Sequence, residues 1–345
     1  MGGLEAKPLA SASGPLDGQS IPMMTERRPL GATDIQLSPI GLGCWQFSEG
    51  KGLIGGFWEA LPRDDVREIL RVSMEEGLNW FDTAEAYGRG ASEQGLSRAL
   101  LELEVEPGEV VVATKWFPFM RTARNLGRTI GDRRRNLSPY AIDLHQVHSP
   151  ISLASVKSQM NTMADLVESG AVRTVGVSNF PEGMMRRAHA ALRARGHPLV
   201  ANQVHYSLLR RNIERNGVME AAKELGITII AYSPLAQGIL SGKYHDDPGS
   251  IQNSSGPRKR MPAFRTKGLE KSRPLLAVLR EIGERHKATP AQVALNWLCN
   301  FHGDTVVAIP GARNVEQARW NATALDFVLN GEELERIDMA SRSVA

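Results

Sequence analysis

The stretch EVVVATKW (109–116) decides the fold class of this chain. It is a continuous, mostly β-branched apolar run, which is typical of a strand buried on both faces of a parallel sheet. Seven further apolar runs resemble it, at 37–45, 78–84, 141–148, 172–179, 199–206, 227–234 and 304–311. Eight such strands that alternate with helices predict a closed (β/α)8 TIM barrel, an α/β fold.

Amphipathic segments occupy the spaces between these runs. Helices are predicted at 64–77, 92–103 with Ser92 as cap, 154–170, 181–196 opened by Pro181, 213–226, 290–300 and 315–325. A short basic segment, 123–137, is predicted as the remaining helix, and its arginines 133–135 as a solvated face. Segment 236–268 is predicted as a long loop. Segment 27–41 is predicted as an N-terminal β-hairpin that closes the bottom of the barrel.

Bulk properties fit one large domain. The 345 residues are 42% hydrophobic, and residues 25–345 are expected to form a single (β/α)8 domain. Residues 1–24 are rich in Gly, Ser, Ala and Pro and are expected to be a disordered tail or a cloning remnant. A net charge of +3 predicts no nucleic-acid or membrane partner. Cys44 and Cys299 without a secretory leader indicate buried free thiols and a cytoplasmic location.

Polar residues stand where the predicted strands end, which is the active-site face of such barrels. Asp82 ends the second strand, Lys115 the third and His148 the fourth. Tyr87 follows Asp82 by five residues, so its side chain can bend back over the mouth. Together these four groups are suited to proton transfer. Taken singly, each has an ordinary explanation, and their joint occurrence at neighbouring strand ends favours the catalytic interpretation.

The chain resembles the aldo-keto reductases, especially the bacterial and plant branch that includes pyridoxal reductases and potassium-channel β-subunit-like proteins. The resemblance covers about residues 28–340 and is carried by these motifs: PIGLGCW, FDTAEAYG, VVATK, DLHQVH, GVSNF, NQVHYSLL, IAYSPLAQGILSGKY, PAQVALNWL and IPGARNVEQARWN. It implies that Tyr87 is the general acid for a carbonyl oxygen. Lys115, paired with Asp82, would lower the pKa of Tyr87, and His148 would hydrogen-bond the carbonyl.

The resemblance also implies a nicotinamide cofactor, with NADPH favoured because Arg313 suits a 2′-phosphate. Its contacts would be Ser178, Asn179, Gln203, Tyr232, Ser233, Leu235, Gln237, Lys243, Gly311, Arg313, Gln317 and Asn321. The family often has an acidic residue at the position of Trp320. The adenine contact at this position is therefore expected to differ from the family's usual one. Trp45 and Trp116 follow strands one and three and are expected to line an apolar substrate pocket.

These features predict an NADPH-dependent oxidoreductase that reduces aldehyde or ketone carbonyls of small molecules, with a homo-oligomer compatible with the sequence. The alternative is a cofactor-binding regulatory or sensor subunit with little turnover. A metal site is not expected, because His145 and His148 lie three apart on a strand and face opposite sides. A Rossmann dehydrogenase is disfavoured, since Cys-Trp-Gln follows Gly41-Leu-Gly43 and breaks the glycine fingerprint.

Overall fold

The computed structural model describes residues 26–251 and 260–345, and its centre is an eight-stranded parallel barrel. The barrel strands are β3 (Leu42–Gly43), β4 (Trp80–Asp82), β5 (Val111–Trp116), β6 (Leu144–Val147), β7 (Thr174–Ser178), β8 (Ala201–His205), β9 (Thr228–Tyr232) and β10 (Val306–Ile309). Neighbouring strands pair in sequence order from β3 to β10. A parallel bridge between Ile40 and Ala308 joins the first strand region to the last, so the predicted (β/α)8 barrel is confirmed.

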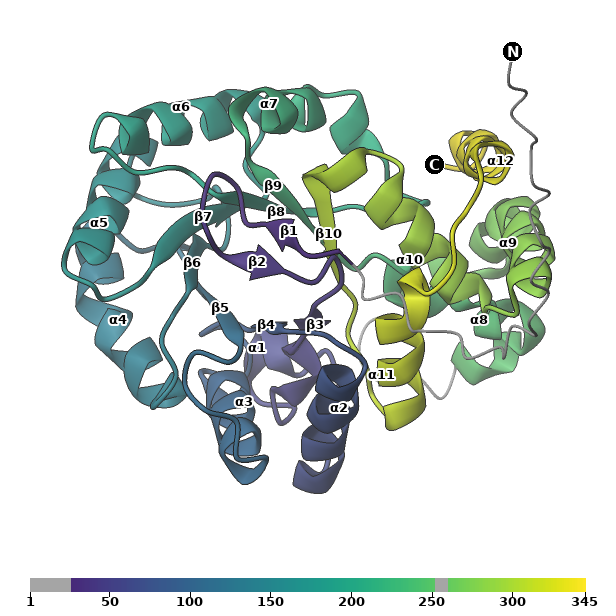
Figure 1. Ribbon diagram of the computed structural model, residues 1–345, viewed down its shortest axis with the longest axis horizontal. Coiled ribbons are helices and arrows are strands. Elements are labelled where there is room, and N and C mark those ends of the chain that lie inside the picture. The colour runs from purple at the N-terminus through teal and green to yellow at the C-terminus, as the bar shows by residue number, and fades with distance from the viewer. Residues whose placement is uncertain (1–25, 252–259) are drawn as a thin grey trace, which may run out of the picture.

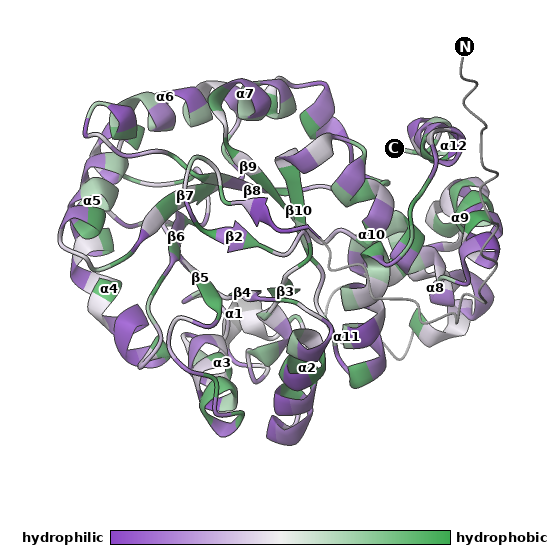
Figure 2. Cartoon of the chain, in the orientation of Figure 1, coloured by the Kyte–Doolittle hydropathy of each residue, from purple (hydrophilic) through white to green (hydrophobic). Residues whose placement is uncertain are grey.

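A shell of helices surrounds the strands (Figure 1). Its helices are α2 (Arg63–Glu75), α3 (Ala91–Glu102), α4 (Ala123–Leu137), α5 (Val156–Glu168), α6 (Glu182–Arg193), α7 (Val218–Leu225), α10 (Pro290–Asn300) and α11 (Val315–Ala322). Figure 2 shows that β5, β9 and β10 are mostly hydrophobic, whereas the surrounding helices carry both hydrophobic and hydrophilic residues. The main apolar core therefore lies between the strands and the helices.

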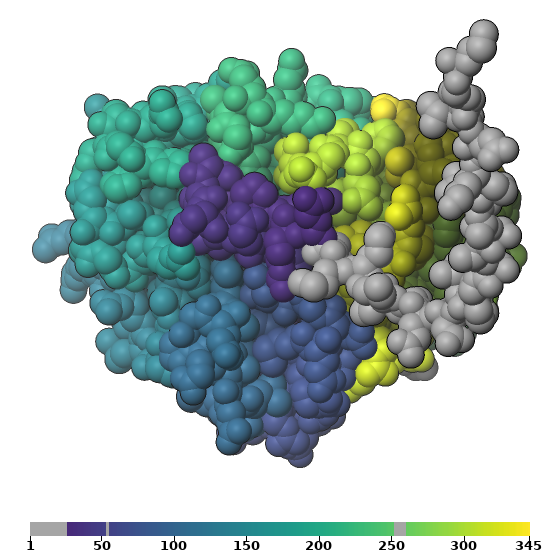
Figure 3. All heavy atoms as spheres, in the orientation of Figure 1, coloured from purple at the N-terminus to yellow at the C-terminus, as the bar shows by residue number. Residues whose placement is uncertain are grey.

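The predicted hairpin consists of β1 (Arg28–Pro29) and β2 (Gln36–Leu37) and covers one end of the barrel. Leu30, Ile35 and Leu37 belong to a second apolar cluster, inside the barrel, which they share with Trp80 and Val200. Figures 1 and 3 view the barrel from this end, and the hairpin lies across the middle of the view. The end of the barrel at which the strands begin is thus sealed, and only the opposite end is open to a ligand.

The first barrel strand is shorter than predicted. The run 37–45 is divided between β2 and the two-residue β3, because Pro39 has no N–H to donate to a sheet ladder. Gly41 passes close to the barrel interior, since a Cβ there would lie 2.3 Å from the Trp80 ring. The chain can therefore cross from the hairpin into the barrel only with glycine at this position.

The helix predicted at 123–137 is confirmed by α4 with the same bounds. The predicted cap is wrong, because α3 begins at Ala91 after Gly90, and the hydroxyl of Ser92 instead donates to the Cys44 carbonyl. The segment 213–226 is also divided. A short 3-10 turn, η2 (Asn212–Glu214), precedes α7, and Gly217 with φ of +82° separates the two.

The predicted loop 236–268 is wrong over most of its described length. It contains short helical elements, η3 (Ala236–Ser241), α8 (Lys243–Asp246), η4 (Pro248–Ile251) and η6 (Pro262–Phe264), and it runs into α9 (Thr266–His286). Helix α9 was not predicted from the sequence, because Pro274 and many charges weaken its helical pattern. Leu275, Leu279 and Ile282 pack into the main core and stabilise the helix from outside.

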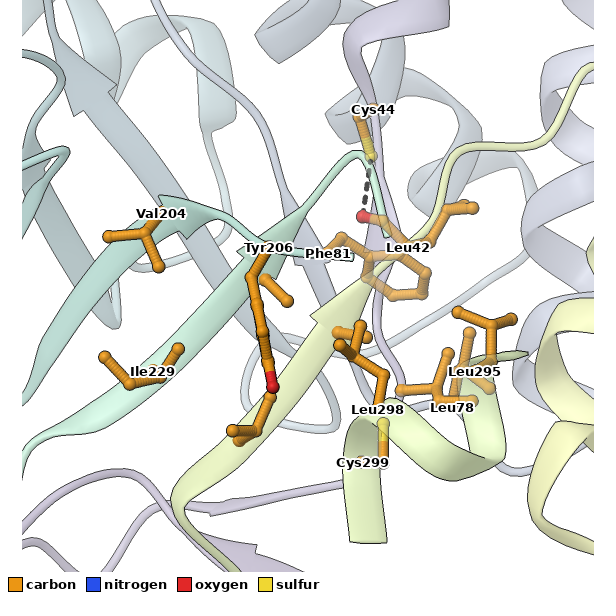
Figure 4. Packing of buried hydrophobic residues seen from close by; sticks show 14 of the residues in the cluster. Leu42, Cys44, Leu78, Phe81, Val204, Tyr206, Ile229, Leu295, Leu298 and Cys299 are labelled. Atoms are coloured by element: carbon orange, nitrogen blue, oxygen red, sulfur yellow. Dashed lines mark hydrogen bonds between the residues drawn. The ribbon is translucent and has the colours of Figure 1, made fainter. Parts of the chain in front are cut away.

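The last helix of the described residues is α12 (Gly331–Arg342), which the sequence analysis did not predict. A short helix, α1 (Gly52–Gly55), follows β3. Both cysteines are free and buried, as predicted. Figure 4 shows Cys44 and Cys299 among apolar side chains, with the Cys44 thiol directed at the Leu42 carbonyl, 3.6 Å away. The expected tail, 1–24, lies outside the described residues. None of the described helices is long and apolar enough to cross a membrane.

Candidate active site

The four residues predicted to transfer a proton converge at the open end of the barrel. Asp82 is the last residue of β4, Lys115 is the next-to-last of β5, and His148 directly follows β6. Lys115 points inward because side chains alternate along a strand, and the parallel register sets it beside Gln146 of β6. Tyr87 lies on the turn after β4 and bends back over the mouth, as the sequence predicts.

Lys115 and Asp82 form an ion pair that is closed to solvent, with exposed fractions of 0% and 1%. The ammonium also donates to the Thr83 carbonyl at 2.8 Å. Burial acts against the charged form, but the Asp82 carboxylate and the Tyr87 oxygen outweigh it and raise the pKa of Lys115. Lys115 therefore stays charged at neutral pH and is fixed in position.

The Tyr87 hydroxyl lies 3.3 Å from the Lys115 ammonium. Burial raises the pKa of Tyr87, and Asp82 adds to this, while the Lys115 charge acts in the opposite direction. The net direction corrects the expectation of a lowered pKa, because removal from water disfavours the phenolate more than one cation favours it. The phenol is thus protonated at neutral pH, and Lys115 is placed to stabilise the anion that remains after proton transfer.

His148 is a neutral imidazole at the edge of the same group. Burial and the nearby Lys115 charge hold the pKa of His148 well below its usual value. Its ring lies edge-on to the Tyr87 ring, with 5.6 Å between centroids. Its Nδ1 has no hydrogen-bond partner among the described residues. A neutral imidazole at this point can donate one hydrogen bond to a carbonyl oxygen without competing for the proton of Tyr87.

Two amides anchor the Asp82 carboxylate from further strands. Gln146 Nε2 donates to Asp82 Oδ2 at 3.1 Å, and Gln203 Nε2 donates to the same oxygen at 3.0 Å. Sequence reasoning assigned Gln203 to the cofactor and missed Gln146. The signal was present in DLHQVH, since alternation places Gln146 on the same face as His148. These amides complete the hydrogen bonding of a carboxylate that has little access to water.

A cavity of about 540 Å³ opens beside this cluster, within the size range of small-molecule sites. Asp82, Tyr87 and His148 line it, and Lys115 lies behind them. All twelve predicted cofactor residues also line it, namely Ser178, Asn179, Gln203, Tyr232, Ser233, Leu235, Gln237, Lys243, Gly311, Arg313, Gln317 and Asn321. The structure thus brings both predicted groups to one cavity, with the loops after β7 to β10 on one side.

Several of these loop residues have a backbone conformation that side chains rarely adopt. Asn179, Ser233 and Gln237 have positive φ angles of 59°, 49° and 56°. Such strain concentrates at functional sites, where the surrounding structure enforces it. The Tyr232 hydroxyl donates to Asn179 Oδ1 at 3.1 Å, which links the ends of β7 and β9 across the site.

The end of the cavity next to β10 is suited to a phosphate group. Arg313 lies there, directly before the N-terminus of α11, and Lys243 lines the same cavity from the β9 side. Gly311 leaves room for the side chain of Gln46, because a Cβ at this position would lie 2.1 Å from Gln46 Nε2. Gln46 lines the cavity too, and its buried Oε1 lacks a partner within the described residues. Sequence reasoning missed Gln46, and no pattern in the chain marked it.

The aromatic wall differs from the prediction. Trp45 lines the cavity, with its ring stacked against that of Tyr87 at 5.8 Å, but Trp116 does not. Trp116 is fully buried and its indole N–H donates to Asn125, because alternation turns it outward when Lys115 points inward. Phe117 and Trp58 line the cavity in its place. Sequence analysis missed both, since their side chains come from loops.

Comparisons with known proteins agree with this geometry. The sequence profile of the aldo/keto reductase family matches residues 39–342, so the chain belongs to this family. An uncharacterized oxidoreductase of Mycobacterium tuberculosis is 40% identical over 311 residues, which are 89% of this chain and 90% of that protein. The chloroplastic pyridoxal reductase of Arabidopsis thaliana is 34% identical over 323 residues, 89% and 84% of the two chains.

Solved structures share the barrel over nearly its full length. The glycerol dehydrogenase of Gluconobacter oxydans superposes with a TM-score of 0.78 at 26% identity and covers 92% of this chain and 95% of its own. An aldo-keto reductase of Klebsiella pneumoniae in complex with NADPH gives a TM-score of 0.69 at 25% identity, with coverage of 92% and 95%. Membership of the family makes this protein an oxidoreductase with a TIM-barrel fold.

Proposed function

We propose that this protein is an NADPH-dependent carbonyl reductase that converts aldehydes or ketones to alcohols. The observation that carries the proposal is the buried Asp82–Lys115 pair, 3.3 Å from a phenol hydroxyl that faces a cavity beside a neutral imidazole. A proton donor, a cation to hold the resulting anion and a hydrogen-bond donor therefore surround one point. This set suits the protonation of a carbonyl oxygen.

The chain's own residues would act as follows. His148 donates a hydrogen bond to the carbonyl oxygen and orients it towards Tyr87. The Tyr87 hydroxyl gives its proton to that oxygen, and the phenolate left behind is stabilised by the Lys115 ammonium. Asp82 keeps Lys115 charged, while Gln146 and Gln203 hold the carboxylate. When it is bound, NADPH supplies the hydride that the carbonyl carbon receives.

The residues around the cavity fit such a cofactor. Ser178 and Gln203 line the cavity with a hydroxyl and an amide, groups suited to a carboxamide, and Tyr232 presents a ring. Gln237 Oε1 is buried with no partner among the described residues, which a bound polar group would satisfy. Arg313 and Lys243 supply two cations for phosphates at the other end of the cavity. The NADPH complex of the Klebsiella relative supports the same assignment.

The carbonyl side of the cavity favours an apolar or ring-shaped substituent. Trp45, Trp58 and Phe117 line it, and the Phe117 ring lies edge-on to His148 with 5.8 Å between centroids. The lining residues with a positive charge, Lys243 and Arg313, come from the loops assigned to the cofactor. We therefore expect uncharged aromatic aldehydes to be better substrates than carboxylated or phosphorylated ones. The pyridoxal reductase of Arabidopsis thaliana, a relative, fits this expectation by name.

The test combines cofactor binding with turnover. Tryptophan fluorescence should report tighter binding of NADPH than of NADH, and a panel of aldehydes and ketones should reveal turnover. Tyr87→Phe should keep the affinity for NADPH and lose about 10²- to 10⁴-fold in kcat, the usual contribution of a general acid. Full activity of this variant would contradict the assignment of Tyr87. Tight NADPH binding with no turnover on any carbonyl would instead indicate a regulatory or sensor subunit.

A further inference from the structure

Arg133, on α4, is buried although the sequence placed it in a solvated basic face. Only 5% of Arg133 is exposed, whereas Arg134 and Arg135 are exposed as expected. A buried guanidinium needs a carboxylate partner, since removing an unpaired charge from water is costly. Arg133 finds this partner in Glu85, which is 9% exposed and belongs to the turn between Asp82 and Tyr87.

Glu85 connects this turn to the end of β5 through both its backbone and its side chain. Its N–H donates to the Lys115 carbonyl at 3.2 Å. Its Oε1 accepts a hydrogen bond from the Phe117 N–H at 2.6 Å and another from Arg121 at 2.6 Å, while Oε2 faces Arg133. Glu85 therefore holds the backbone on both sides of Trp116, Lys115 through its own N–H and Phe117 through its carboxylate.

The two segments that Glu85 joins both contribute to the reaction side of the cavity. Tyr87 lies two residues after Glu85, and Phe117 forms the wall beside His148. Of the two cations on the carboxylate, Arg121 has an exposed fraction of 39% and Arg133 of 6%, measured on their side chains. Water weakens the first pair more than the second, so the Arg133 pair is the stronger constraint.

We propose that Glu85, held by Arg133, is a positioning residue that sets the distance between the acid Tyr87 and the substrate wall at Phe117. This inference rests on the proposed carbonyl reduction and adds a residue pair that does not touch the substrate. The pair lies beside β4 and β5, away from the loops after β7 to β10. It should therefore act on kcat and KM for the carbonyl and leave the affinity for NADPH unchanged.

The experiment compares Glu85→Gln, Arg133→Met and the double variant with wild type. Arg134→Met is the matched control, because it removes the neighbouring, exposed arginine of the same helix. Kinetics would use 4-nitrobenzaldehyde, an aromatic aldehyde, and propanal, which is smaller. Fluorescence titration gives the dissociation constant of NADPH, and thermal unfolding monitors the fold.

Both single variants should lose about 10- to 100-fold in kcat/KM for 4-nitrobenzaldehyde, since a displacement near 1 Å has effects of this size. The loss should be smaller for propanal, and the NADPH dissociation constant should stay within about twofold, a shift close to measurement error. The double variant should lose no more kcat/KM than either single variant, because each single change already breaks the same Glu85–Arg133 contact. Arg134→Met should behave as wild type.

Each other outcome has a distinct meaning. Wild-type kcat/KM in folded Glu85→Gln and Arg133→Met would overturn the positioning role while the proposed function stands. Weakening of NADPH binding in parallel with kcat/KM would also overturn it, because the effect would then be general. If a single variant folds poorly, the double variant, in which neither member of the Glu85–Arg133 pair is charged, carries the same test. Absence of turnover in wild type would instead overturn the proposed function itself.

Discussion

Two buried charge clusters in this molecule have similar chemistry and different surroundings. At the barrel mouth, Asp82 pairs with Lys115 beside a phenol that faces the cavity. Next to α12, Arg211 pairs with Glu214 and Asp338, and its side chain is 2% exposed. The guanidinium of Arg211 lies over the ring of Trp297, at 4.7 Å from its centroid.

The difference lies in what each cluster borders. The Arg211 cluster is enclosed by aromatic rings and joins α12 to the segment that contains η2, so its charges hold two parts of the chain together. The Asp82–Lys115 pair joins adjacent strands that already share a ladder, and Lys115 also contacts the hydroxyl of Tyr87, the proposed acid. Burial and ion pairing alone therefore do not identify a catalytic site. The proposal of a catalytic role rests on the contact with a phenol that lines the cavity.

The largest expected effect is that of Lys115→Met. The change removes the cation that stabilises the Tyr87 phenolate, and we expect kcat to fall by about 10²- to 10⁴-fold. It also leaves the Asp82 carboxylate buried without a cation, which should lower the free energy of unfolding by about 3 to 5 kcal/mol. Steady-state kinetics and urea denaturation measure the two effects separately.

The double variant Asp82→Asn/Lys115→Met sharpens this result. It buries no charge, so most of the lost stability should return, since neutral replacement of a buried ion pair is often tolerated. Activity should stay as low as in Lys115→Met. Recovery of activity together with stability would show that the pair acts only on the fold.

Arg211→Met should show the reverse of this double variant, with lower stability and unchanged activity. It leaves Glu214 and Asp338 without their buried cation and should lower the free energy of unfolding by about 3 kcal/mol. The turnover of the folded enzyme should stay within about twofold of wild type, because changes in unconnected parts of a protein act independently. Denaturation curves and kinetics at low temperature give both quantities. A loss of kcat comparable to that of Lys115→Met would remove the distinction between the clusters.

Acid should destabilise the Arg211 cluster in a defined pH range. Burial acts to raise the pKa of Glu214, but its contacts with His302, Arg211 and Tyr206 outweigh burial and lower it from 4.5 to about 2. A carboxyl whose pKa is depressed on folding adds stability above its unfolded pKa and loses this contribution as pH falls. Stability should thus decline from pH 4.5 towards pH 2. In Glu214→Gln, urea denaturation should show a shallower decline across this range.

The smallest expected effect concerns an exposed ion pair. Arg313 Nη2 lies 3.2 Å from Glu59 Oε2, and 62% of the Glu59 side chain is exposed. Such pairs contribute at most about 1 kcal/mol, so Glu59→Gln should barely change stability. By releasing Arg313 for a phosphate, it should tighten NADPH binding by up to about fivefold and leave NADH binding unchanged. Equal effects on both cofactors, measured by fluorescence titration, would argue against a 2′-phosphate contact at Arg313.

The sequence by itself determined the barrel and the strand-end residues. Apolar runs such as EVVVATKW have the length and composition of buried parallel strands, and strand alternation alone places Lys115 inward. Because the carboxyl ends of all barrel strands meet at one mouth, Asp82, Tyr87 and His148 could be brought together without coordinates. The same alternation, applied consistently, would have excluded Trp116 from the pocket and included Gln146.

Only the tertiary structure decided the features that depend on contacts between distant segments. Helix α9 exists despite Pro274 because its apolar face packs into the core, which local propensity does not reveal. Whether the pKa of Tyr87 is raised or lowered depends on the balance between burial, which raises it, and the nearby Lys115 cation, which lowers it. The sequence analysis placed Arg133 among three solvated arginines, whereas its pairing with Glu85 follows from how α4 packs beside the turn after β4. Sequence spacing specifies which residues share a face, whereas burial and partner choice arise only when the elements pack together.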